Sequence, residues 1–214
     1  MKDLKSNEGV GVGRVKLLGC RSDRVKKALA IVGSPRRNKN TEKIVDRIVE
    51  GLLEKDIIVK KVNLKDLKIT PCTACGYCEN EGSCIIDDDM QNLYKDFDES
   101  DIIILGSPVY FNTVSTYVKA MIDRCQMFWS SKYVLNKSVI DANKQRQGVF
   151  VAVGGAPYTK GQFDACVPVV DLFFKSINTK YSYNILLSNT DKVDITKRQD
   201  ILIEAQRIGS ELVK

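Results

Sequence analysis

The chain has 214 residues with seven cysteines, no histidine and a net charge of +6 at pH 7. This length suits one α/β domain with a sizeable core, and the lack of histidine excludes Ser-His-Asp and Cys-His catalysis and His-ligated metals. No run of eighteen apolar residues occurs, and residues 1–20 contain no apolar signal-peptide core, so we expect a cytoplasmic protein without a membrane span.

The positive charge is concentrated near the start of the chain. Residues 1–27 contain eight basic and three acidic side chains, which amounts to +5 and leaves the rest nearly neutral. A basic segment can contact nucleic acid or an acidic protein, but this one has no aromatic residues that could stack on bases. We therefore predict a solvated basic extension at 1–25, a folded domain at 26–214, and no nucleic-acid partner.

Strands and helices alternate along the domain. An apolar run at 28–34 ends in a Gly-Ser turn signal and predicts a buried strand. Residues 41–54 place Ile44, Ile48 and Leu52 on one helical face, and 56–64 predict a second strand. Further strands are predicted at 101–107, 148–154 and 183–188, and helices at 88–97, 113–127, 162–178 and 196–213.

Such alternation predicts an α/β fold with a parallel sheet covered on both faces. Five strands suit a flavodoxin-like, doubly wound sheet in the order 2-1-3-4-5, and a cysteine-rich loop at 70–87 follows the second strand. In this architecture ligands bind beyond the carboxyl ends of the strands, so the loops after strands one, three and four are the candidate site.

Four cysteines lie within thirteen residues. Cys72, Cys75, Cys78 and Cys84 have the spacing C-x2-C-x2-C-x5-C. Three closely spaced thiolates with a fourth nearby are typical of a [4Fe–4S] cluster, and the ferredoxin spacing C-x2-C-x2-C-x3-C is similar. The run therefore predicts an iron–sulfur site and a role in electron transfer.

Two other interpretations of this run stay open. A structural zinc site usually takes its ligands as two separated pairs, and reduced thiols can also stand without a metal. Disulfides are not expected in a chain with an odd number of cysteines and no secretory leader. The scattered Cys20, Cys125 and Cys166 are interpreted as small hydrophobic residues.

The loop after the first strand has the chemistry of a phosphate site. The run GSPRRNKNT at 33–41 leads into a helix, whose first N–H groups favour an anion. The hydroxyls of Ser34 and Thr41, the amides of Asn38 and Asn40, and the guanidinium of Arg36 can add hydrogen bonds. The alternative is an ordinary polar turn with Asn40 or Thr41 as the helix N-cap.

The loops after strands three and four carry groups that can line a flat ring. Pro108, Tyr110 and Phe111 follow the third strand, although aromatic residues there more often serve packing. Gly154 and Gly155 follow the fourth strand, where glycine permits close approach to the backbone. A Gly-x-Gly-x-Gly run at 9–13 has no strand before it and does not predict a dinucleotide site.

Together, GSPRRNKNT at 33–41, GSPVYFN at 106–112 and the glycine pair at 154–155 resemble the flavin-binding segments of the NADPH-dependent FMN reductase family. With the cysteine run and the DDDM at 87–90, the chain resembles the iron–sulfur flavoprotein branch of that family. The resemblance covers about residues 26–213. It implies a dimer or a dimer of dimers, with FMN near the subunit interface.

The resemblance also implies site residues. The FMN phosphate is expected on Ser34, Arg36, Asn38, Asn40 and Thr41, the ring against Pro108, Val109, Tyr110, Phe111 and Asn112, with Gly154 and Gly155 at its far side, and the cluster on Cys72, Cys75, Cys78 and Cys84. No side chain is required as a nucleophile, because the cofactors carry the chemistry. The cysteine loop follows strand two, so we expect it at the same sheet edge as the FMN loops.

The function predicted from these features is an FMN-dependent oxidoreductase that relays electrons between a one-electron donor, such as ferredoxin, and an acceptor. A second reading is an NAD(P)H-dependent FMN or quinone reductase without a functional cluster. A third, of another class, is a zinc-stabilised binding module. We expect a homodimer or homotetramer.

Overall fold

Five parallel strands form the centre of the protein in the computed structural model, which describes residues 24–213. They are β1 (Lys27–Val32), β2 (Ile58–Asn63), β3 (Ile102–Tyr110), β5 (Arg146–Val153) and β6 (Thr179–Leu187). Their order is β2-β1-β3-β5-β6, which confirms the predicted 2-1-3-4-5 arrangement. A two-residue strand, β4 (Thr113–Val114), pairs antiparallel with the end of β3. The predicted basic extension lies almost entirely outside the described residues.

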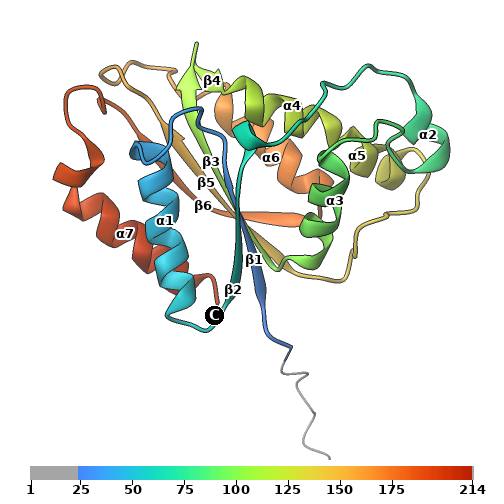
Figure 1. Cartoon of the computed structure of the whole chain (residues 1–214), viewed down its shortest axis with the longest axis horizontal. Helices are drawn as coiled ribbons and strands as arrows, with labels where there is room; N and C mark the ends of the chain where they lie inside the picture. The colour runs from blue at the N-terminus through green and yellow to red at the C-terminus, as the bar shows by residue number, and fades with distance from the viewer. Residues whose placement is uncertain (1–23, 214) are drawn as a thin grey trace, which may run out of the picture.

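Helices cover both faces of the sheet (Figure 1). One face carries α1 (Asn40–Leu53) and α7 (Gln199–Glu211); the other carries α3 (Met90–Glu99), α4 (Thr116–Arg124), α5 (Gln126–Tyr133) and α6 (Cys166–Ser176), with the short α2 (Tyr77–Glu81) outermost. Short 3₁₀ turns occupy Leu64–Asp66 and Ile195–Lys197. Within 24–213, no helix combines the length and the apolar character that a membrane span requires.

The central strands are apolar on both sides because each side meets a helix layer. In β1, Leu29 and Ile31 belong to the core shared with α3, α4 and α6, whereas Ala28, Ala30 and Val32 belong to the core under α1 and α7. All five side chains are almost completely buried. Burial on both faces explains the nearly continuous apolar runs that predicted a parallel sheet.

The predicted helix at 113–127 is divided in the structure. Its first two residues form β4, and Ser115 then caps α4 by accepting a hydrogen bond from the Val118 N–H. The helix ends at Arg124, and α5 starts after Cys125 in a new direction. The predicted strand at 183–188 begins earlier, at Thr179, because that residue pairs with Arg146 of β5.

Two glycines bring α1 and α7 into backbone contact. A Cβ at Gly209 would lie 2.1 Å from the carbonyl oxygen of Ile48, and one at Gly51 would lie 2.1 Å from that of Gln206. These are backbone atoms, so neither contact can be relieved by a side-chain rotation. The close approach of the two helices therefore depends on glycine at both positions.

We expect Gly209→Ala to destabilise the protein. Because the clashing atom belongs to the backbone, we expect overpacking to cost about 2–3 kcal/mol, the upper part of its usual range. The better helix propensity of alanine returns about 1 kcal/mol, so the net loss should be about 1–2 kcal/mol. Urea unfolding followed by circular dichroism measures this loss. Ile203→Ala, at an exposed position of the same helix, serves as the control and should change stability by less than about 0.5 kcal/mol. Equal stability of Gly209→Ala and wild type would contradict the helix-contact argument.

Candidate functional site: two cavities, one at the sheet edge and one lined by cysteines

A small polar cavity of about 240 Å³ lies at the carboxyl ends of the central strands, and we call it the edge pocket. It is formed by the loops after β1, β3, β5 and β6 and by the start of α1. Its lining consists of Ser34, Arg36, Lys39, Asn40, Thr41, Pro108, Val109, Tyr110, Val153, Gly155, Ala156, Thr190 and Asp191.

The structure brings most of the predicted FMN residues together here. The predicted residues in the lining are Ser34, Arg36, Asn40, Thr41, Pro108, Val109, Tyr110 and Gly155. Those outside it are Asn38, Phe111, Asn112 and Gly154. Three loops distant in sequence thus meet as the parallel-sheet rule predicts.

Each excluded residue has a local explanation. The Asn38 N–H donates to Glu42 Oε2 at 2.6 Å, in a residue with positive φ. Phe111 and Asn112 form the positive-φ tip of the β3–β4 turn, and the Phe111 side chain is fully exposed. A Cβ at Gly154 would point toward the interior of the protein and not into the pocket, since it would lie 2.6 Å from Gln162 Nε2. These four residues shape the edge of the site without lining it.

Sequence reasoning missed Lys39, Val153, Ala156, Thr190 and Asp191. Three of these are neighbours of predicted residues. Thr190 and Asp191 follow β6, and the same edge rule applied to the fifth strand would have found them. The Asp191 carboxylate packs on Gly155, where a Cβ would lie 2.4 Å from Asp191 Oδ2. The absence of a side chain at Gly155 thus leaves space for the Asp191 carboxylate of the same chain.

The start of α1 places groups that favour an anion at the edge pocket. Helix α1 is 14 residues long, and its first N–H groups point toward the pocket end, where the helix dipole is positive. Arg36 and Lys39 add two cationic side chains. Ser34 holds the loop by accepting from the Arg36 N–H at 3.2 Å and donating to the Arg36 carbonyl at 3.1 Å.

Asn40 has a structural role that its sequence position did not reveal. Its side-chain oxygen accepts from the Ile195 N–H at 3.1 Å, and its amide nitrogen donates to the Thr190 carbonyl at 3.5 Å. The side chain therefore fastens the loop after β6 to the start of α1. What Asn40 can offer an anion is its backbone N–H.

A buried ion pair supports the loop between β1 and α1. Glu42 is almost completely buried and pairs with Lys61 Nζ at 2.8 Å, and Lys61 also contacts Asp46 at 2.5 Å. Burial tends to raise the pKa of Glu42, but hydrogen bonds from Lys61 and the Asn38 N–H outweigh it, so the pKa lies below its ordinary value of 4.5. Glu42 is thus an anion that shapes the loop.

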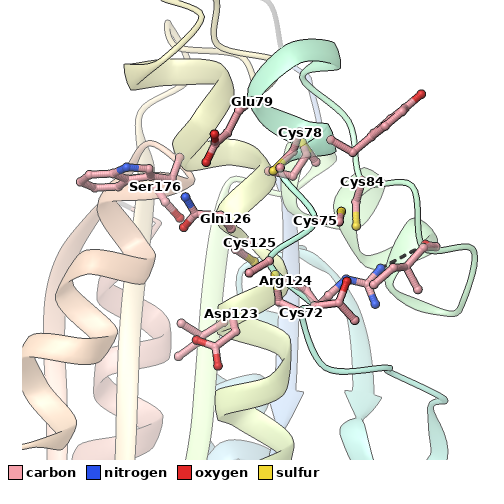
Figure 2. A pocket seen from close by; sticks show the side chains of 18 of the residues that line it. Cys72, Cys75, Cys78, Glu79, Cys84, Asp123, Arg124, Cys125, Gln126 and Ser176 are labelled. Atoms are coloured by element: carbon pink, nitrogen blue, oxygen red, sulfur yellow. Dashed lines mark hydrogen bonds between the residues drawn. The ribbon is translucent and has the colours of Figure 1, made fainter.

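A larger cavity of about 660 Å³ lies at the outer side of the α4–α6 layer, and we call it the cysteine cavity (Figure 2). Cys72, Cys75, Cys78 and Cys84 all line it. Cys72 and Cys75 are exposed, and Cys78 and Cys84 are partly buried. Among residues 24–213, no three His, Cys, Asp or Glu side chains are grouped closely enough to hold a single metal ion.

Three residues of the cysteine loop have a left-handed backbone conformation. Ala74, Gly76 and Gly82 have φ of 51°, 73° and 65°, and the two glycines flank α2 at its N-cap and C-cap. Glycine adopts this conformation without a Cβ penalty, which lets the chain reverse around the cavity. The local sequence therefore turns all four cysteines toward one space.

The cysteine cavity is not at the predicted sheet edge. Its wall includes Lys119, Ile122, Asp123 and Arg124 of α4 and residues of α6, and it shares no lining residue with the edge pocket. Helix α4 starts at the carboxyl edge, where the Ser115 hydroxyl donates to the Gly33 carbonyl at 2.7 Å, and its nine residues extend about 14 Å away from it. The loop after β2 crosses this layer before it reaches α2 (Figure 1).

A fifth cysteine, Cys125, also lines the cavity. It is buried between α4 and α5, and burial raises the pKa of its thiol well above the ordinary value. Cys166, the first residue of α6, is also buried, and burial raises its pKa to about 11. Both are neutral, packed thiols, which confirms their interpretation as small hydrophobic residues. Cys20 lies outside the described residues.

A doubly wound parallel sheet with a small polar pocket at its carboxyl edge is the architecture of a flavodoxin-like domain. The family model for NADPH-dependent FMN reductase matches residues 26–163, which is more than half of the chain. The chain belongs to this family.

Several relatives that the chain resembles are named iron–sulfur flavoproteins. An iron–sulfur flavoprotein from Archaeoglobus fulgidus is 42% identical over 98 residues, covering 46% of this chain and 44% of that protein. An iron–sulfur flavoprotein from Methanosarcina thermophila is 32% identical over 130 residues, covering 61% of this chain and 64% of that protein. The chain thus matches about half to two thirds of the length of these relatives.

Solved structures agree with the fold. An FMN-dependent NADH-azoreductase from Bacillus anthracis, in complex with FMN, superposes with a TM-score of 0.68 at 16% identity, covering 89% of this chain and 100% of that one. An NAD(P)H:quinone oxidoreductase from Methanothermobacter marburgensis gives a TM-score of 0.63 at 13% identity, covering 89% and 98%. At these identities the likeness shows the fold alone.

The Glu42 ion pair predicts a pH dependence of stability. Because the folded-state pKa of Glu42 is lowered, its contribution is present above pH 4.5 and is lost as the pH falls through the folded pKa. Glu42→Gln should lose about 1–2 kcal/mol at neutral pH and show a flatter profile below pH 4.5.

Urea unfolding across this pH range measures the effect. Glu204→Gln removes an exposed carboxylate that pairs with Arg207, and it should change stability by less than about 0.5 kcal/mol. A Glu42→Gln profile parallel to that of wild type would show that this carboxylate does not carry the dependence.

Proposed function

We propose that this protein is an FMN-dependent oxidoreductase that also holds a [4Fe–4S] cluster and passes electrons between a one-electron donor and an acceptor. The observation that carries the proposal is that Cys72, Cys75, Cys78 and Cys84 line one cavity in a chain that also forms the edge pocket. Membership of the FMN reductase family supports the FMN part of the proposal, and the names of the relatives support the cluster part.

The edge pocket fits the phosphate end of FMN. The start of α1 and the side chains of Arg36 and Lys39 supply hydrogen-bond donors and positive charge. Pro108, Val109 and Tyr110 lie in the same wall and offer apolar and aromatic surface to the ring. No second nucleotide fingerprint is present in the sequence, which favours FMN over FAD.

The cysteine cavity fits an all-thiolate cluster. Its donors are four cysteines on one loop, its other walls are largely apolar, and a buried guanidinium N–H of Arg124 beside it has no hydrogen-bond partner. A free buried donor of this kind suits an anionic group such as a cluster held by four thiolates. When bound, FMN exchanges one or two electrons and the cluster exchanges one. The chain holds and orients both groups and limits water.

A homodimer or homotetramer is part of the proposal. Four side chains that line the cysteine cavity are partly or largely exposed apolar groups: Tyr77, Ile85, Trp129 and Leu172. A contiguous exposed apolar surface of this kind favours contact with another protein surface. A second copy packed here would shield the cavity, while ferredoxin is the proposed one-electron partner.

The first test concerns the FMN phosphate. Arg36→Ala should weaken FMN binding by about 1.5–3 kcal/mol, or roughly tenfold to more than a hundredfold, because a charge-assisted hydrogen bond is lost. Titration of flavin-free protein, followed by flavin fluorescence, measures the change. Riboflavin, which lacks the phosphate, should bind equally to wild type and variant.

The neighbouring arginine provides a matched control. Arg37 pairs with Asp66 and does not line the edge pocket, so Arg37→Ala should leave FMN affinity within a few-fold of wild type. Tight binding of FAD alone, or equal FMN affinity in Arg36→Ala and wild type, would contradict the assignment of the pocket.

The second test concerns the cluster. Cys75→Ala should lose most iron and acid-labile sulfide after anaerobic preparation while it retains FMN, because the two cavities share no residue. Cys125→Ala changes a neutral, buried thiol of the same cavity and should retain both. If wild-type protein instead contained stoichiometric zinc and no sulfide, the cysteines would form a zinc site and the cluster proposal would be wrong.

The same two variants test the electron donor. In anaerobic stopped-flow experiments, reduced ferredoxin should reduce the flavin of wild type and Cys125→Ala faster than NADPH does, and Cys75→Ala should lose this advantage. Rapid reduction by NADPH that is indifferent to Cys75 would instead identify an NAD(P)H-dependent FMN or quinone reductase.

A further inference from the structure

Arg124 is a buried arginine in the wall of the cysteine cavity. It is the last residue of α4, and its side chain has 0% exposure. Figure 2 shows it beside the cysteine loop, next to Cys125. A fully buried guanidinium is costly unless it is paired and hydrogen-bonded, so its partners indicate its role.

These partners come from both ends of the cysteine loop. Arg124 Nη1 donates to the Thr70 carbonyl at 2.8 Å and to Asp88 Oδ2 at 2.7 Å, and Nη2 donates to the Ile86 carbonyl at 3.1 Å. Asp88 is 2% exposed and also accepts from the Thr70 N–H at 2.8 Å. One ion pair thus closes the loop that carries all four cysteines.

The third nitrogen of Arg124 has no partner. Nε is one of three buried polar side-chain atoms without a hydrogen bond in residues 24–213. Arg146, the other large buried arginine, uses all three nitrogens: Nε donates to the Phe97 carbonyl, Nη1 to the Asp141 carbonyl and Nη2 to Asp98. The unused donor is therefore peculiar to the arginine at the cysteine cavity.

Arg124 and the four cysteines of the loop line the same cavity. Burial tends to lower the pKa of Arg124, but the hydrogen bond to Asp88 outweighs it and holds the pKa above its ordinary value. A positively charged guanidinium with one free N–H donor therefore lies in the wall of the cysteine cavity.

We propose that Arg124 is a positioning residue that closes the cysteine loop and raises the reduction potential of the cluster. This inference rests on the proposed function. Reduction adds one electron, and hence one negative charge, to a group already made anionic by four thiolates. A nearby positive charge and an N–H donor to sulfur both stabilise the reduced state. Asp88, the partner of Arg124, opposes this effect with its negative charge.

The ion pair itself supplies a matched pair of variants. Arg124→Gln removes a positive charge, and Asp88→Asn removes a negative charge while it keeps an oxygen for the Thr70 N–H. Both weaken the same closure of the loop. If Arg124 only holds the loop, both variants admit water to the cluster and shift its potential in one direction. If its charge acts on the cluster, the two shifts have opposite signs.

The experiment is a redox titration of the intact protein with dithionite as the reductant, followed by electron paramagnetic resonance of the cluster. We expect the midpoint potential to fall in Arg124→Gln and to rise in Asp88→Asn. Arg146→Gln removes an equally buried arginine that does not line the cysteine cavity, and it should leave the potential unchanged. Equal potentials, or shifts of one sign in Arg124→Gln and Asp88→Asn, overturn the inference.

Arg124→Lys covers the case in which Arg124→Gln assembles no cluster. It keeps the charge but loses the Nε–H, so its potential should lie below wild type; a potential at or above wild type overturns the inference. These failures leave the proposed function intact, because the cluster is then present. Wild-type protein without iron and sulfide overturns both.

Discussion

Burial of a parallel sheet on both faces is the constraint on which the rest of this structure depends. It brings the carboxyl ends of β1, β3 and β5 to one edge, where the loops that follow them meet around the edge pocket. The Gly33 N–H donates to the Gly106 carbonyl at 2.7 Å, and Ser115 ties the start of α4 to Gly33, so neighbouring loops are held to each other. The pocket is thus built on a rigid frame.

The same constraint separates the two cavities. A helix that follows a parallel strand must return along the sheet, so α4 leads away from the edge pocket and ends at Arg124. The cysteine loop, although it follows β2, crosses to the end of this helix. One subunit therefore carries an anion-attracting pocket at one end of α4 and a thiol-lined cavity at the other.

Buried charge has the same function in three places. Glu42 with Lys61 supports the loop at the edge pocket, Arg124 with Asp88 closes the cysteine loop, and Arg146 with Asp98 fastens the chain before β5 to the end of α3. In each case a charged group also bonds to a backbone atom of a connecting segment: Glu42 to the Asn38 N–H, Arg124 to the Thr70 carbonyl and Arg146 to the Asp141 carbonyl. A buried ion pair of this kind contributes little net stability but strongly disfavours alternative loop positions.

Local sequence determined the elements and the residue types of the sites. Apolar runs such as 28–34 and 101–107 predicted the central strands because burial on both faces leaves no room for alternation. The cysteine spacing named the four thiols that line the cysteine cavity, and the polar loop at 33–41 named Ser34, Arg36, Asn40 and Thr41 of the edge pocket. Boundaries failed where a distant partner decided them, as at Thr113–Val114, which pairs with β3, and Thr179, which pairs with β5.

Only the tertiary structure decided how these residues are used. Asn40 was a phosphate candidate by sequence, but its side chain binds the loop after β6, 150 residues away. Thr190 and Asp191 entered the edge pocket by the same long-range contact. The sequence did not point to Arg124, because the role of this residue depends on its contacts with Thr70, Ile86 and Asp88. Only the fold brings these residues next to it. Local periodicity indicates which element a residue belongs to and whether it is buried. The partners of the residue depend on which ends of the strands and helices come together in the fold.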